Sequence, residues 1–468
     1  MKRTLILLSV LGFLTCVLFA EFSIVSVDSG SYPRGIAIAD VGFGTGNEVI
    51  VANFGAGTLI GQDGSGDTSS SIAIFSGGNK TVSQAGKSPR GVAAGDIDGD
   101  GKADYAVTNY DDGTVMIFTG SGTQTFEAGR HPVGVAIGDA TGDGKNDVAV
   151  AVYSESKVVL FTRSMKNSWN KYELVVPGSP TDVTIGTLAG EPVIASANYG
   201  AGSVSIIKMD AAGLVKAVDI VSGGGACKVR IADVTGDGSN EIITANFFDN
   251  TISVIKKGFI GGFEEPVVYK LEGLRPNGMA VGDVNNDGLN DIVVANRDSD
   301  SIDILLQENG VLRLAHTVPA SDDEDKTYGP VEAAIGDINN NGLNDIVFTH
   351  MRSGTIKVIY QKAGISFKDA AAEPLNEANT YNYPNPCEEN TFIRFSSDKQ
   401  QDVKILITDV SGRPVWTRDI PAASVRAGVN TVEWQLVNDM GAKVANGIYL
   451  LRVSAGERAV TKKIAVGK

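Results

Sequence analysis

A chain of 468 residues is too long for one ordinary hydrophobic core unless it closes on itself as a repeat architecture. Its 40 Lys and Arg residues against 55 Asp and Glu residues give a formal net charge of −15, which should repel nucleic acids and anionic membrane surfaces and argues against both as partners. A hydrophobic content of 43% supports a packed core and 56 glycines indicate many turns, so the composition predicts a globular, all-β chain.

Residues 1–20 have the composition of a secretory signal peptide. A Lys-Arg pair precedes an apolar run that ends at Ala20, and no stop-transfer pattern follows. We expect cleavage after Ala20, which leaves a mature chain without a transmembrane span. The two distant cysteines that remain, Cys227 and Cys387, do not make a disulfide framework.

A glycine-rich acidic loop recurs along the chain. The best-preserved copy, DIDGDGKAD from Asp96, has carboxylates at positions 1, 3, 5 and 9. Copies begin at residues 40, 96, 139, 187, 233, 283 and 337, which are 43 to 56 residues apart, and we number these acidic loops one to seven. The fourth, from Thr187, has lost the motif. A period of this size is that of a propeller blade.

Each repeat contains four short apolar runs in the same order. In the second repeat they are residues 91–95, 105–110, 115–118 and 124–129, with the acidic loop between the first two. Short runs rich in Val and Ile, separated by Gly, Asp and Asn, are typical of strands. Four strands in each of seven repeats predict a seven-bladed β-propeller over residues 21–368.

The ends of the propeller predict how the ring closes. The seventh repeat is complete only through its third run, residues 355–360. We therefore expect the N-terminal run, residues 22–27, to supply the fourth strand of the last blade. The alternative is that residues 364–370 fill that place.

The repeats resemble the FG-GAP/VCBS family, which includes the propellers of integrin α-chains and of many bacterial surface proteins. The residues that carry the resemblance are the acidic loops and the recurring strand ends VANF, VTNY, SANY, TANF and VANR. The resemblance covers about residues 22–370 and implies the propeller fold. It says little about function, because the family spans adhesins, lectin-like modules and parts of enzymes.

The C-terminal part has a different texture. Residues 369–380 are small and polar and predict a linker, and residues 381–468 alternate strands with Gly turns, which predicts a small immunoglobulin-like β-sandwich. The charge also changes there, since residues 381–468 contain 12 basic and 9 acidic residues, whereas the propeller carries the negative charge.

This part closely resembles the C-terminal sorting domain of the type IX secretion system. The matching positions are Tyr383-Pro384-Asn385-Pro386, Asp409-Val410-Ser411-Gly412-Arg413, Trp434, Gly441, Gly447-Ile448-Tyr449 and Lys462-Lys463. Two departures are Cys387, where the family usually has an aromatic residue, and WQLVND, where it often has Trp-Asp-Gly. The resemblance implies export by the type IX secretion machinery to the cell surface or the medium.

The acidic loops predict calcium sites. Ca²⁺ binds six to eight oxygens, and ligands at positions 1, 3, 5 and 9, with a backbone carbonyl at 7, surround such an ion. An EF-hand is excluded because position 12 of the second loop is Val107, inside a strand. Plain Asx-turns are the alternative, but four carboxylates within nine residues repel one another without a cation.

Five of the seven loops supply the expected ligands. They are Asp96, Asp98, Asp100, Lys102 (by its carbonyl) and Asp104 in loop two, Asp139, Thr141, Asp143 and Asp147 in loop three, Asp233, Thr235, Asp237 and Glu241 in loop five, Asp283, Asn285, Asp287 and Asp291 in loop six, and Asp337, Asn339, Asn341 and Asp345 in loop seven. Loop seven has only two carboxylates. We expect little or no binding in loop one and none in loop four.

No catalytic site is predicted. Catalytic acid–base pairs occur once in a protein, not once per blade. The three histidines lie in separate repeats without metal-ligand spacing, and the sequence has no nucleophile elbow, HExxH or phosphate loop.

The rim opposite the acidic loops is a candidate binding face. Loops that precede the first strands bring basic residues there, and the ends of the second strands add amides and aromatic rings. The candidate residues are Arg34, Arg90, Arg130, Lys228 and Arg275, with Asn109, Tyr110, Asn198, Tyr199, Asn246 and Phe247, and Phe54, Tyr153 and Arg297 lie at equivalent strand ends. Such a face suits an anionic glycan or a carboxylate-bearing peptide. The alternative is that these residues only complete turns.

Together these features predict a secreted or cell-surface, calcium-binding propeller that acts as a binding or adhesion module. The competing hypotheses are a secreted polysaccharide-degrading enzyme and a structural component of the surface layer.

Overall fold

The computed structural model describes residues 24–44, 46–55, 70–163, 168–211, 213–258, 262–308, 310–321, 329–361, 375, 380–383, 391–425 and 428–467. The chain forms two compact units, residues 1–365 and 366–468, which are described separately. The predicted signal peptide and most of the predicted linker lie outside the described residues. Among the described residues, no helix has the length and apolar composition that a membrane crossing requires.

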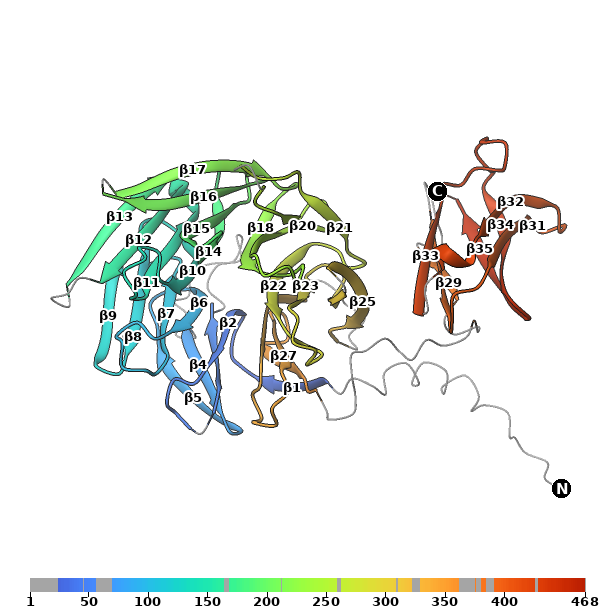
Figure 1. Ribbon diagram of the computed structural model, residues 1–468. Helices are drawn as coiled ribbons and strands as arrows, with labels where there is room; N and C mark the ends of the chain where they lie inside the picture. The colour runs from blue at the N-terminus through green and yellow to red at the C-terminus, as the bar shows by residue number, and fades with distance from the viewer. Residues whose placement is uncertain are drawn as a thin grey trace, which may run out of the picture. The chain divides into compact units, whose positions relative to one another are not determined.

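The first unit is a ring of four-stranded antiparallel sheets around a central channel (Figure 1). Its described residues form seven such sheets, and the first six each consist of four consecutive strands. Blades one to three contain β2(Pro33–Ala39), β3(Glu48–Asn53), β4(Ser71–Ser76) and β5(Asn79–Gln84); β6(Pro89–Gly95), β7(Asp104–Asn109), β8(Thr114–Thr119) and β9(Gly122–Glu127); and β10(Pro132–Gly138), β11(Asp147–Val152), β12(Lys157–Arg163) and β13(Trp169–Val175), with the short 3-10 helix η1(Tyr153–Glu155).

The other four blades follow the same plan. They contain β14(Pro180–Leu188), β15(Glu191–Asn198), β16(Ser203–Asp210) and β17(Gly213–Val221); β18(Ala226–Ala232), β19(Glu241–Asn246), β20(Thr251–Ile255) and β21(Val267–Lys270); β22(Pro276–Gly282), β23(Asp291–Asn296), β24(Ser301–Glu308) and β25(Val311–Pro319); and β26(Pro330–Gly336), β27(Asp345–His350) and β28(Thr355–Ile359). The first strand of each blade lines the channel, and the fourth is the outermost.

The last blade takes its fourth strand from the N-terminus, as predicted. β1(Ile24–Asp28) pairs antiparallel with β28 from Ile24 opposite Ile359 to Asp28 opposite Thr355. The ring therefore closes between the two ends of the unit, and β28 is not left as an open edge. The alternative strand, residues 364–370, lies outside the described residues.

Burial follows the position of each strand in its blade. The second strands are fully buried in six blades, because neighbouring blades cover both of their faces, whereas outer strands such as β5 and β9 are almost entirely exposed. Val and Ile of adjacent blades interdigitate to form the core, and one cluster joins Leu160 of blade three to Val183 and Ile194 of blade four. This packing explains why the apolar runs are rich in β-branched residues.

The second unit is a β-sandwich with one shared core. A sheet of β29(Tyr381–Tyr383), β30(Thr391–Ser397) and β33(Gly428–Trp434) packs on a sheet of β32(Pro414–Ile420), β31(Val403–Asp409), β34(Gly447–Ala455) and β35(Arg458–Val466), with the 3-10 helix η2(Ala422–Ser424) between β32 and β33. The fully buried Trp434 lies among residues of both sheets. Leu375, in the segment predicted as a linker, is buried in this core.

Candidate functional site

The acidic loops join the first and second strands of the blades, and their carboxylates shape the backbone. In loop two, Asp96 accepts hydrogen bonds from the N–H groups of Gly99 (2.6 Å) and Gly101 (2.9 Å). The carboxylate of Asp104 accepts from the N–H groups of Ile97 (2.8 Å) and Asp98 (3.0 Å). Positions 1 and 9 of the motif therefore hold the loop in its bend.

Loop two fits a divalent cation. Carboxylate oxygens of Asp96, Asp98 and Asp104 all lie within 4.8 Å of one another. One oxygen of Asp98, Oδ1, is buried without any hydrogen-bond donor. An orphaned anionic oxygen beside two other carboxylates is costly unless a cation approaches it. Asp100 and Lys102 are exposed on the outer turn, where Asp100 accepts from the Lys102 N–H (2.9 Å).

Loops three, six and seven repeat the backbone geometry with fewer carboxylates. Their first residues, Asp139, Asp283 and Asp337, each accept from the N–H of the glycine at position 6 (2.8 Å). Burial raises the pKa of Asp147 and of Asp291 to about 6. The remaining predicted ligands, Thr141, Asp143, Asn285, Asp287, Asn339, Asn341 and Asp345, lie in the same loops, but of the described loops only two and five bring three carboxylates within 4.8 Å.

Loop five differs because a lysine lies among its predicted ligands. The ammonium of Lys256, just after β20, is 2.8 Å from Asp237 Oδ2 and 3.0 Å from Thr235 Oγ1. It is also 4.0 Å from Glu241 Oε1. The hydrogen bond from Lys256 lowers the pKa of Asp237 below its usual value. Lys256 therefore contacts or approaches three of the four predicted ligands of loop five, Thr235, Asp237 and Glu241.

Sequence reasoning missed a contact that links neighbouring loops. The residue at position 8 is Asn in five of the seven copies, and its amide donates to the carbonyl of position 1 in the preceding blade's loop. These contacts are Asn47 to Asp337 (2.9 Å), Asn146 to Asp96 (2.8 Å), Asn240 to Thr187 (3.0 Å), Asn290 to Asp233 (3.0 Å) and Asn344 to Asp283 (2.8 Å). The recurrence of Asn at one position was the available signal. These side-chain hydrogen bonds thus join loops two and three, and loops four, five, six, seven and one in turn.

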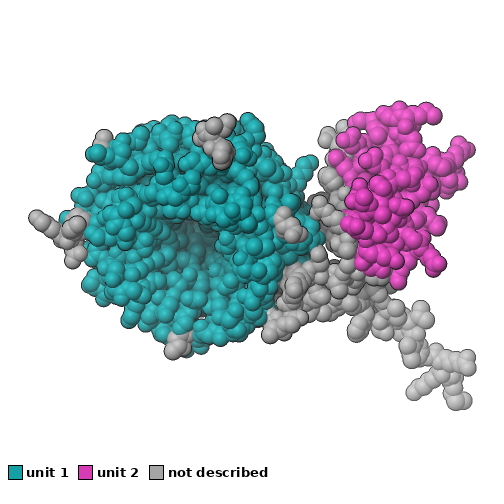
Figure 2. Space-filling view, viewed as in Figure 1, with its two compact units in different colours: residues 1–365 teal, residues 366–468 magenta. Residues whose placement is uncertain are grey.

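At the opposite rim the channel widens into a cavity of about 510 Å³, the channel mouth, lined by the first strands of all seven blades. Figure 2 shows the hollow at the centre of the unit. Six residues predicted for the binding face line it, namely Arg34, Arg90, Lys228, Tyr110, Tyr199 and Phe247. Tyr153 and Arg297 line it as well.

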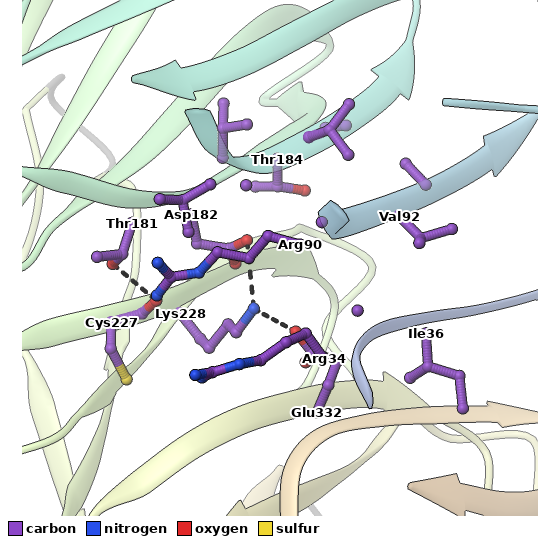
Figure 3. A pocket seen from close by; sticks show the side chains of 18 of the residues that line it. Arg34, Ile36, Arg90, Val92, Thr181, Asp182, Thr184, Cys227, Lys228 and Glu332 are labelled. Atoms are coloured by element: carbon purple, nitrogen blue, oxygen red, sulfur yellow. Dashed lines mark hydrogen bonds and ion pairs between the residues drawn. The ribbon is translucent and has the colours of Figure 1, made fainter. Parts of the chain in front are cut away.

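Two of the cations at the channel mouth are neutralised by carboxylates that sequence reasoning did not single out. Lys228 pairs with Glu332 and lies 3.6 Å from Asp182. Arg230 donates to Asp182 at 2.7 Å and lies 3.9 Å from Glu332. These four side chains come from β14, β18 and β26, and Figure 3 labels Asp182, Lys228 and Glu332. The network therefore joins blades four, five and seven and leaves no free charge there.

Arg34 and Arg90, from blades one and two, have no such partner. Among the described residues, no carboxylate lies within 4.0 Å of either guanidinium group, and the Nε of Arg34 is buried without a hydrogen-bond partner. Burial and the positive charges of Arg90 and Arg297 lower the pKa of Arg34 to about 9. Burial also lowers the pKa of Arg90. Figure 3 shows both side chains extending into the cavity.

Aromatic rings hold both guanidinium groups in place. Arg34 lies over Phe54, 5.4 Å from the ring centroid, and Arg90 lies over Tyr110 at 5.0 Å. Tyr110 in turn stacks on His131 with centroids 4.3 Å apart. Arg90 also interacts with the hydroxyl group of Tyr110, so the aromatic residues hold the guanidinium groups without neutralising their charge.

The structure does not bring the other predicted residues into the channel mouth. Arg130 is exposed beside Glu155, and Arg275 lies over Phe247, 3.9 Å from Asp298.

The three predicted amides are fully buried and complete turns instead, as the alternative interpretation held. Asn109 accepts from the N–H of Gly86 (3.1 Å), Asn198 donates to Ser205 (2.9 Å), and Asn246 donates to Ser253 (2.9 Å). Their side chains point into the blades because the second strands end with that register.

Cys227 lines the channel mouth but is not a reactive group. Its thiol lies 3.1 Å from the carbonyl of Pro276, and burial raises its pKa to about 12. A thiol so protonated is a poor nucleophile.

Family comparisons agree with this architecture. Residues 96–150 and 283–348 match the FG-GAP-like repeat, and residues 382–467 match the secretion system C-terminal sorting domain. The chain is therefore a propeller protein with FG-GAP-like repeats. It carries a type IX sorting domain, is handled by that secretion machinery, and is secreted or located at the cell surface. No relative was found among curated proteins.

The solved structures to which this chain is similar share few identical residues with it. BBS1N, solved in complex with ARL6DN, is 10% identical with a TM-score of 0.52, covering 74% of this chain and 97% of that one. Hydrazine synthase of Kuenenia stuttgartiensis is 15% identical with a TM-score of 0.50, covering 72% and 97%. PorZ, a surface component of the type IX secretion system of Porphyromonas gingivalis, is 14% identical with a TM-score of 0.46, covering 90% of this chain and 58% of that one. These likenesses concern the fold alone.

Proposed function

We propose that the mature protein is an extracellular binding module that holds an anionic ligand at the channel mouth of a calcium-stabilised propeller. The observation that carries the proposal is the pair Arg34 and Arg90, two half-buried cations in a cavity without a carboxylate partner among the described residues. Burying part of a guanidinium group without an anion beside it is costly, so a site that does so is suited to an incoming anion.

The charge of the whole chain makes the proposal specific. With a net charge of −15, most of the surface repels anions, and the channel mouth concentrates cations that are not neutralised. An anion would thus be drawn to one place on the molecule.

Calcium has the complementary role of stabilising the rim that carries the acidic loops. The orphaned oxygen of Asp98 supports a calcium ion in loop two, and the shared motif extends the proposal to loops three, six and seven. Because the position-8 amides link loop two to loop three and loop six to loops five and seven, neutralising the carboxylates of one loop should also stiffen the loops linked to it. At a free calcium concentration 100 times the dissociation constant, each site would add about 2.7 kcal/mol of stability.

Binding is tested with the mature full-length protein and two immobilised polyanions, polygalacturonate and dextran sulfate, beside neutral dextran. We expect salt-sensitive retention on at least one polyanion and none on dextran. The double variant Arg34→Gln/Arg90→Gln should no longer be retained on the polyanion. The control Arg130→Gln, which removes a basic residue outside the cavity, should be retained like the wild type. Equal retention of the two variants would refute the channel mouth as the site, and release of shortened chains would indicate an enzyme.

Calcium is tested by thermal unfolding of the same protein in calcium and in chelator. We expect the wild type to have a lower melting temperature in chelator than in calcium. In the Asp96→Asn/Asp98→Asn variant of loop two, this difference should be smaller. A melting temperature that does not depend on calcium would disprove the calcium sites.

A further inference from the structure

The channel mouth is electrostatically divided. On the side of blades one and two, Arg34 and Arg90 have no carboxylate partner among the described residues, whereas on the side of blades four, five and seven the cations Lys228 and Arg230 are already paired. An anionic group of a ligand would therefore go to the arginines. A second anionic group reaching the other side would find Lys228 and Arg230 already paired with Asp182 and Glu332.

The shape of the two free cations favours a planar acceptor. Both guanidinium groups lie over aromatic rings and line the cavity, and each presents a planar fork of N–H donors. A carboxylate accepts two parallel N–H bonds from such an edge. Ammonium groups, which act as point charges, would not supply this geometry.

The rest of the lining favours a ligand rich in hydroxyl groups. The phenols of Tyr153 and Tyr199, the hydroxyl of Thr184 and the amide of Asn277 border the cavity. The carboxylates of Asp182 and Glu332 add hydrogen-bond acceptors for neutral hydroxyls. A volume of about 510 Å³ lies within the range of about 300–1,000 Å³ typical of small-molecule sites.

From these features we infer that the ligand is a uronic acid residue of a glycan, with its single carboxylate on Arg34 and Arg90 and its hydroxyls toward blades four to seven. This inference rests on the proposed function, because it names the ligand class of the same site. The inference predicts that the site binds a carboxylate-bearing sugar in preference to a sulfated sugar.

Calorimetry with the mature full-length protein tests it, using a galacturonic acid trimer, a neutral galactose trimer and a sulfated galactose trimer. We expect the galacturonate to bind at least 10-fold more tightly than the other two. The variant Arg34→Lys/Arg90→Lys keeps both charges but loses the planar edges, and it should bind galacturonate at least 10-fold more weakly. Arg130→Lys is the matched control and should bind as the wild type, with the melting temperature of each variant as the check on folding.

The outcomes are distinguishable. Tighter binding of the sulfated trimer, or unchanged binding by the lysine variant, would overturn the uronate inference and leave the anion-binding function standing. No binding of any anionic trimer, together with no retention on the polyanions, would overturn both.

A separate observation carries a second inference, on loop five. Lys256 reaches Asp237, Thr235 and the neighbourhood of Glu241, which are three of the loop's predicted calcium ligands. In the equivalent position of loop four's blade, Lys208 pairs with Glu191, so two adjacent blades bring a lysine to this rim. We infer that the Lys256 ammonium is the permanent cation of loop five and that this loop binds no calcium.

Counting bound calcium by native mass spectrometry tests this inference. We expect Lys256→Met to bind one ion more than the wild type and to require calcium for the stability that the wild type has without it. The matched control Lys257→Met, at the next residue, should leave the count unchanged. An unchanged count in Lys256→Met, or a wild-type count that falls in Asp237→Asn, would refute it.

Discussion

A methyl group added to Gly134 should push two blades apart. Gly134 lies in β10, two residues after its first proline, where Gly35, Gly91 and Gly278 occupy the equivalent positions of their own blades. A Cβ atom placed on Gly134 would be 2.7 Å from the Cα of Asp182 and 3.0 Å from the carbonyl oxygen of Thr181, both in the neighbouring strand β14.

The magnitude follows from what the methyl group meets. Carbon atoms pack at about 3.5–4.0 Å, so the contact to the Cα of Asp182 is nearly 1 Å too short and falls on backbone that cannot rotate away. Overpacking of this kind costs about 1–3 kcal/mol, and we expect the upper half of that range. Alanine also reduces the conformational entropy of the unfolded chain relative to glycine, which offsets only about 0.4–1 kcal/mol of this cost.

Urea unfolding of Gly134→Ala, followed by tryptophan fluorescence, measures the cost. Gly120→Ala is the control, because its added Cβ would meet only the flexible carboxylate end of Asp100, at 3.3 Å. We expect a lower midpoint for Gly134→Ala alone, with the slope of the transition unchanged. Equal midpoints for the two variants would refute the claim that glycine is required for blade contact.

Three further predictions follow from the fold. Asn146→Ala should cost about 1 kcal/mol in urea unfolding because it leaves the Asp96 carbonyl without its donor, whereas Lys145→Ala, at a half-buried neighbour whose side chain does not make this hydrogen bond, should cost less. The pKa of Asp300 is below its usual value because hydrogen bonds, that from His350 first, outweigh the effect of burial. An acidic group whose pKa is lower in the folded than in the unfolded protein stabilises the fold above its unfolded pKa of about 3.9, and this contribution is lost as the pH falls through the folded pKa. Asp300→Asn should therefore be less stable than the wild type at pH 7, and the difference in unfolding free energy should shrink in acid. A difference in unfolding free energy that does not change with pH would contradict this. Starting the mature chain after β1 should expose the edge of β28, lower the melting temperature and promote self-association seen by light scattering, and a monomer with the wild-type melting temperature would show that β1 is dispensable.

Much of the architecture could be predicted because its signals are local and repeated. Alternating Val and Ile runs between glycine-rich turns specify strands, and a period of 43 to 56 residues specifies the blade. The missing fourth strand of the last repeat and the unassigned N-terminal run predicted the closure by β1, since an open edge must be covered. The same repetition placed the arginines and aromatic residues on one rim.

The sequence alone could not decide which of these side chains are free. Asn109 and Tyr110 are neighbours in the chain, yet the amide is buried in the blade and the ring lines the channel mouth, because β7 ends at Asn109 and the turn begins at Tyr110. The sequence has no local sign of the pairing of Lys228 with Glu332, which lie 104 residues apart.

Charge compensation is what the tertiary structure decided. Motif positions made loops two and five look alike, and only the fold brings Lys256 into one of them and leaves an oxygen of Asp98 orphaned in the other. In the same way, it neutralises Lys228 and leaves Arg34 without an anion. Coulomb energies depend on distances between residues far apart in the chain, so the sequence by itself determined the strands, the repeats and the rim, and the closed ring decided where unbalanced charge remains.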